Sequence, residues 1–114
     1  MTKVKLPSKI RFADDKVKEA FNELKGSDKK EKGLHEWLVR AYKDIEGNAF
    51  CGIQIPKRLI PKEYIKKYKV KNLWKYNLPD AWRLIYSIEA NEIIVISIVL
   101  EWMDHKEYER KFKY

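Results

Sequence analysis

Three strand-like segments follow one another in the C-terminal half of the chain, and their order limits the possible folds more than any other feature. The segments read NLWKYNLP, AWRLIYSIE and EIIVISIVL. They are rich in β-branched and aromatic residues, and only Pro79-Asp80 and Ala90-Asn91 separate them. Connections this short join antiparallel neighbours, because a parallel crossover needs about a dozen residues or more. The sequence therefore predicts an antiparallel meander.

Helical periodicity occupies the region before these strands. Val17, Ala20, Phe21 and Leu24 recur at the spacing of one helix face, and Asp14 or Asp15 precedes them as the expected N-cap. A second stripe, which stops at Gly47-Asn48, comprises Leu34, Trp37, Leu38, Ala41, Tyr42 and Ile45. We expect two amphipathic helices, arranged as a hairpin, ahead of the main strands.

Shorter signals complete the pattern. Alternating apolar residues around Pro7 indicate a short or edge strand, and CGIQIP is typical of a brief one. Pro61 suits the first turn of a short basic helix, and DHKEYERKF is polar and helical in character. Together these elements predict a single α+β domain over residues 1–114, with helices on one face of an antiparallel sheet of about four strands and a short C-terminal helix.

Side-chain alternation assigns the two faces of this sheet. If Ala90-Asn91 is a two-residue turn, Arg83 lies opposite Ile98. The helix-covered face then holds the large apolar residues Trp82, Leu84, Tyr86, Ile88, Val95 and Val99. Arg83 is expected on the other face, which would be more open to solvent and available to a phosphate.

Positive charge is concentrated between residues 57 and 75. This segment holds eight basic residues against Glu63 alone, a net charge of +7 out of +8 for the whole chain. Such a field attracts polyanions, so nucleic acid is the leading partner class. An acidic protein, a membrane surface or a general need for solubility would also suit this charge. The expected RNA-binding residues are Lys57, Arg58, Lys62, Lys66, Lys67, Lys69, Lys71 and Lys75.

A set of three residues near the C-terminus could cleave RNA without a metal. Attack by the 2′-hydroxyl needs a base, a cation for the charge on phosphorus, and an acid for the leaving oxygen. Arg83, His105 and Tyr108 are the catalytic candidates, because the last two are three residues apart on the expected helix. Arg83 could instead pair with an acid, and His105 and Tyr108 could be a surface and a packing residue.

Other chemistry lacks a sequence signal. There is no glycine-rich phosphate loop, GxSxG or HExxH motif, and His35 has no metal-ligand pattern around it, so neither a metal nor a cofactor is expected. The single Cys51, the absence of a signal-like leader and the shortness of the longest apolar run, residues 93–100, predict a cytoplasmic protein without a membrane partner.

The C-terminal pattern resembles the RelE/ParE superfamily of toxins from type II toxin-antitoxin systems. The residues that carry this resemblance are NLWKYNLPDAWRLIYSI, EIIVISIVL and DHKEYERKFKY. It implies a curved antiparallel sheet with N-terminal helices and, for the RelE branch, cleavage of mRNA on the ribosome. It also implies a cognate antitoxin as partner, and roles in catalysis for the strand arginine, Arg83, and the C-terminal tyrosine, Tyr108. His105 falls in the adjoining catalytic region.

Two alternatives to the ribosome-dependent endoribonuclease remain at this point. A ParE-like toxin would inhibit DNA gyrase and would not need His105 or Tyr108. A non-catalytic RNA- or ribosome-binding protein would use only the basic segment. The chain departs from the best-known RelE members because it lacks a dense cluster of basic residues directly after the last strand.

Overall fold

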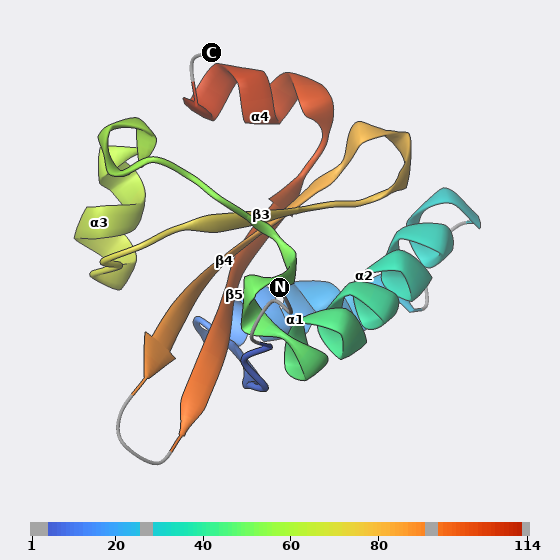
Figure 1. Ribbon diagram of the computed structural model, residues 1–114. Coiled ribbons are helices and arrows are strands. Elements are labelled where there is room, and N and C mark those ends of the chain that lie inside the picture. Colours follow the sequence, from blue (N-terminus) through green and yellow to red (C-terminus); the bar gives the residue numbers. More distant parts are fainter. Residues whose placement is uncertain (1–4, 26–28, 91–93, 113–114) are drawn as a thin grey trace.

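The computed structural model describes residues 5–25, 29–90 and 94–112, which form an α+β fold with four α-helices and a five-stranded sheet (Figure 1). Every predicted helix and strand region holds such an element. The helices are α1 (Asp15–Leu24), α2 (Lys29–Gly47), α3 (Lys62–Tyr68) and α4 (His105–Phe112). The strands are β1 (Lys9–Phe12), β2 (Ile53–Gln54), β3 (Trp74–Asn77), β4 (Arg83–Ala90) and β5 (Val95–Met103).

The sheet has the order β1-β5-β4-β3-β2. Strands β3, β4 and β5 form the predicted antiparallel meander, and β2 adds to it as a two-residue antiparallel edge. The expectation of about four antiparallel strands was wrong in one respect, because β1 pairs with β5 in parallel and makes a five-stranded mixed sheet. This pairing joins residues nearly ninety positions apart, so no local signal in the sequence specifies its direction.

The predicted register of β4 against β5 was also wrong. Arg83 lies opposite Met103, not Ile98. Ala90 pairs with Val95, so four residues connect the strands instead of two, and a bulge between Ile85 and Tyr86 shifts the pairing by one more residue. Asn91, which belonged to the predicted turn, lies outside the described residues.

Each face of the sheet carries its own apolar core. The first core lies under α1 and α2 and includes the predicted residues Leu84, Tyr86 and Val99, with Trp82 and Ile88 partly buried beside them. The second core joins the opposite face to α3 and α4. The expectation of an open second face was therefore wrong, because the side chains Ile55, Ile60, Tyr64, Leu73, Ile85, Leu100, Met103, Tyr108 and Phe112 are buried on it.

Local features explain where the helices begin and what they bury. Asp14 has extended backbone angles and its Oδ1 accepts a hydrogen bond from the Val17 amide at 2.9 Å, which makes it the N-cap of α1. Most of the predicted stripe of α2 is buried, with Leu38, Ala41 and Ile45 fully so. In the described part of the chain, no helix is long and apolar enough to span a membrane.

Candidate functional site

Two cations from neighbouring strands converge on one aromatic ring. The Lys75 Nζ of β3 lies 5.0 Å from the centroid of the Tyr108 ring, and the Arg83 guanidinium carbon of β4 lies 5.3 Å from it. Both distances fall within the range of cation–π attraction. The sheet register brings this about: Lys75 pairs with Ile85 and Asn77 with Arg83, so Lys75 and Arg83 point to the same face, where α4 delivers Tyr108.

Only part of the hydrogen-bonding capacity of the Arg83 guanidinium is satisfied. Its Nη1 donates to the Trp82 carbonyl oxygen at 3.3 Å, whereas its Nε is buried and has no hydrogen-bond partner among the described residues. The structure shows no ion pair from Arg83 to Asp80, Glu101 or Asp104 within that same set. A buried donor without a partner costs free energy. Binding of an anion that accepts from this edge of the guanidinium is therefore favourable.

The candidate catalytic residues do not all come together. Tyr108 is only 3% exposed and stacks on Phe112, with ring centroids 4.5 Å apart, so it faces the second core. His105, one turn earlier, has a 53% exposed side chain whose Nε2 lies 2.8 Å from Glu109 Oε1. The helix therefore turns Tyr108 inward toward Arg83 and leaves His105 on its exposed side.

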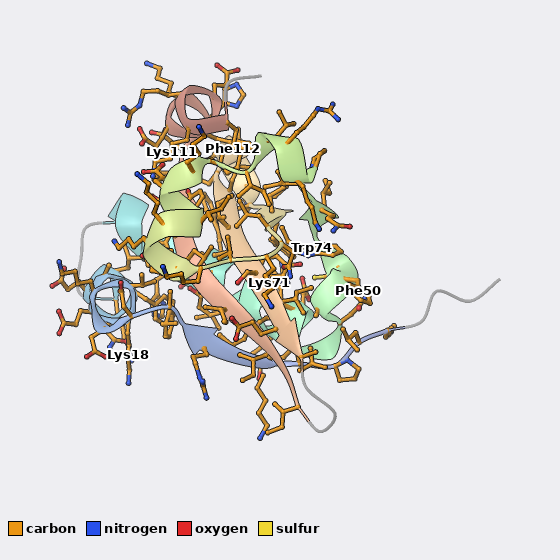
Figure 2. The ribbon with its side chains drawn as sticks, turned by 90° about the vertical axis from the view of Figure 1, so that its left-hand side faces the viewer. Lys18, Phe50, Lys71, Trp74, Lys111 and Phe112 are labelled. Carbon is orange, nitrogen blue, oxygen red and sulfur yellow. The ribbon has the colours of Figure 1, made fainter. Side chains whose placement is uncertain are left out.

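The basic segment, residues 57–75, meets this cluster at Lys75. Seven of the eight predicted RNA-binding residues are exposed, and Lys75 is half-buried. They come from η2 (Lys57–Leu59), which is a short 3-10 turn, from α3, from the connection that follows α3 and includes Lys71 (Figure 2), and from β3. Sequence reasoning placed Lys75 in the RNA-binding set and Arg83 in the catalytic set, but the fold joins the two through Tyr108. The alternation of side chains in β3, combined with the register of the β3–β4 hairpin, is the signal that would have revealed this.

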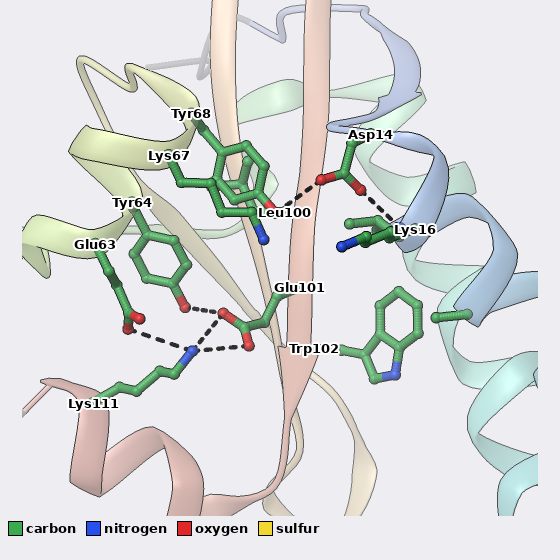
Figure 3. A pocket seen from close by; sticks show the side chains of 12 residues that line it. Asp14, Lys16, Glu63, Tyr64, Lys67, Tyr68, Leu100, Glu101, Trp102 and Lys111 are labelled. Carbon is green, nitrogen blue, oxygen red and sulfur yellow. Dashed lines mark hydrogen bonds and ion pairs between the residues drawn. The ribbon is translucent and has the colours of Figure 1, made fainter.

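A network of charges holds α4 against the sheet, and sequence reasoning did not identify it. Lys111 Nζ donates to both carboxylate oxygens of Glu101, at 3.0 and 2.9 Å, and lies 3.4 Å from Glu63 Oε1. The Tyr64 hydroxyl of α3 donates to Glu101 as well (Figure 3). Burial, reinforced by the hydrogen bond to this carboxylate, raises the pKa of Tyr64 well above its ordinary value. The network thus links α3, β5 and α4, the helix that carries Tyr108.

Two acidic residues mark the start of α4. Asp104 Oδ1 accepts from the Glu107 amide at 2.9 Å, which is an N-cap contact, and Glu107 is the acid of the first turn. Asp104 and Glu107 therefore stabilise the helix end.

His35 packs against an aromatic ring. Its ring stacks on Phe21 with centroids 4.6 Å apart, in the contact between α1 and α2. Among the residues that the structure describes, no three His, Cys, Asp or Glu side chains are grouped so as to hold a metal ion.

The arrangement can bind a phosphate group between two cations and next to a basic surface. Comparison with family models, with curated proteins and with solved structures found no match for this chain.

Proposed function

We propose that this protein is the toxin of a type II toxin-antitoxin system and that it acts on mRNA at the ribosome as an endoribonuclease of the RelE kind. The observation that carries the proposal is the convergence of Arg83 and Lys75 on Tyr108, with a buried guanidinium donor that no described residue satisfies. We also propose the finer fold expected for such a toxin, in which a helical hairpin packs on a curved sheet.

In this proposal the two cations stabilise the scissile phosphate. Arg83 offers a planar fork, which suits two oxygens of one phosphate, and Lys75 adds a point charge from the adjacent strand. Both positions are preorganised by the sheet, so they stabilise the charge that develops during attack by the 2′-hydroxyl. Tyr108 is a positioning residue, because its ring holds both cations while its side chain is buried.

Proton transfer falls to His105 in the same scheme. Its exposed position suits contact with RNA that passes over the start of α4. Because Nε2 lies against Glu109, the other ring nitrogen, Nδ1, accepts the 2′-hydroxyl proton in this scheme, and water protonates the 5′-oxygen as its bond to phosphorus breaks. The exposed lysines of residues 57–71 guide the RNA strand, and their contribution depends on salt. An antitoxin that is acidic or helical and covers this basic face is the expected protein partner.

Cleavage on translating ribosomes tests the proposal. A defined message is incubated with wild type, Arg83→Ala, His105→Ala and the matched control Arg40→Ala, whose exposed arginine lies on α2. Mapping of 5′ ends by primer extension measures the cuts. We expect Arg83→Ala and His105→Ala to lose about a hundredfold or more in rate and Arg40→Ala to cleave normally. Unchanged cleavage in the first two variants refutes the assignment.

A non-catalytic RNA- or ribosome-binding protein is the second candidate. The observation in its favour is that His105 lies on the exposed side of α4 while Tyr108 is buried. Under this alternative the intact protein makes no cuts, Lys66→Glu with Lys67→Glu abolishes ribosome binding, and His105→Ala changes nothing. Inhibition of gyrase supercoiling by the intact protein would instead point to the ParE branch.

A further inference from the structure

A pocket of about 390 Å³ lies between α1 and α3 (Figure 3). The Arg83 cluster, which comprises Lys75, Arg83 and Tyr108, does not line it. It exists because β1 ends opposite Val99 while β5 continues to Met103. The last residues of β5 therefore form the floor of an opening whose walls are two helices. The volume falls within the range of about 300–1,000 Å³ that is typical of small-molecule sites.

The acidic groups of this pocket already have hydrogen-bond or ion-pair partners within the protein. Glu101 and Glu63 share Lys111, and Glu101 also accepts from Tyr64. Asp14 caps α1 through one carboxylate oxygen, and its other oxygen lies 3.4 Å from the Tyr68 hydroxyl. With Lys16 and Lys67 included, three cations balance the three carboxylates Asp14, Glu63 and Glu101, so the pocket as a whole is close to neutral.

Two cations remain for a ligand. Lys16 on α1 and Lys67 on α3 extend into the opening from opposite walls, as Figure 3 shows. Neither makes an ion pair within the described parts of the chain, although Lys67 also contacts the Tyr68 ring, 5.1 Å from its centroid. A ligand that carries a compact negative charge satisfies both.

The rest of the lining is aromatic and apolar. Trp102 and Tyr68 are half-buried and present ring surface, while Val17, Ala20 and Leu100 supply aliphatic surface. A planar heterocycle can stack on such rings. A purely acidic peptide segment fits less well, because it would bring several charges toward Asp14, Glu63 and Glu101.

We propose that this pocket binds a nucleoside monophosphate, either free or as one nucleotide of an RNA strand, with its phosphate between Lys16 and Lys67 and its base against Trp102 or Tyr68. This site is separate from the Arg83 cluster and does not rest on the proposed nuclease activity. It would give the protein a second nucleotide contact, beside the last residues of β5.

Calorimetric titration with AMP, GMP, CMP and UMP tests this site in the intact protein. We expect saturable binding that Lys16→Gln with Lys67→Gln weakens about tenfold or more, since two charge-assisted contacts are lost. The control, Lys18→Gln with Lys43→Gln, removes two exposed lysines of α1 and α2 that neither line the pocket nor belong to the basic segment. The control should bind within about twofold of wild type.

The same titration in Arg83→Ala separates this pocket from the proposed active site, because nucleotide binding to the pocket should persist in this variant. Quenching of tryptophan fluorescence that disappears in Trp102→Phe would support the stacking contact. The proposal is overturned if both lysine pairs lose affinity equally, if no saturation occurs at millimolar nucleotide, or if inorganic phosphate or an acidic peptide binds as tightly as the nucleotides.

Discussion

Neutralising Glu101 should loosen α4 from the sheet. Glu101→Gln keeps an acceptor for the Tyr64 hydroxyl but removes the charge that faces Lys111 Nζ at 2.9 Å. Lys111 then keeps only Glu63, at 3.4 Å. A fully buried pair that loses one member costs about 3–5 kcal/mol, whereas an exposed pair contributes less than about 1 kcal/mol. The side chains here are 30% and 18% exposed, so we expect an intermediate loss. Our figure is about 2 kcal/mol in the free energy of unfolding.

A double-mutant cycle measures the interaction itself. Urea unfolding of Glu101→Gln, Lys111→Met and the double variant should give a coupling energy of about 1–2 kcal/mol. The exposed pair Glu107 and Arg110 on the same helix is the control and should give less than about 0.5 kcal/mol. High salt should remove the control coupling and leave most of the other. A coupling for Glu101 and Lys111 no larger than that of the control would refute the reasoning and leave α4 held by apolar contacts alone.

Two further perturbations follow from the geometry. An added Cβ at Gly52 would lie 2.6 Å from both the Lys75 carbonyl oxygen and the Tyr86 hydroxyl, so Gly52→Ala should lower the free energy of unfolding by about 2 kcal/mol, whereas Gly47→Ala, which meets open space, should not. A thermal melt that shows equal effects would contradict this. Alkaline pH is the second perturbation. Burial raises the pKa of Tyr64. Burial by itself would lower the pKa of Lys111, but its hydrogen bonds and charge attraction to Glu101 outweigh this effect, so the pKa of Lys111 is raised as well. A group whose pKa is higher in the folded than in the unfolded state contributes its full stabilisation of the fold only below the unfolded pKa. The free energy of unfolding should therefore fall as pH rises beyond about 10. Tyr64→Phe should make this fall less steep, and an unchanged slope would count against the shift.

Local pattern determined the helices and the faces of the strands. The helical spacing in α2 places Leu38, Ala41 and Ile45 on its buried face. The alternation in β4 places Leu84 and Tyr86 in one core and Ile85 in the other. These outcomes follow from the geometry of a single helix or strand, which sequence neighbours fix. From Tyr86 to Ala90 the predicted faces survived the register error, because the longer connection displaced the pairing by four residues and alternation has a period of two. The bulge adds the fifth residue of displacement at Arg83.

Tertiary structure decided everything that depends on how separate elements meet. The parallel pairing of β1 with β5, the bulge beside Ile85 and the docking of α4 arise from non-local contacts. Those contacts covered the face that was expected to be open, and they turned Tyr108 inward and left His105 outside. The sequence by itself supplied Arg83, Lys75 and Tyr108 as candidates, but only the packing of β3, β4 and α4 brings them together. Convergence of side chains from three elements is a property of register and docking, and neither is encoded within any one element.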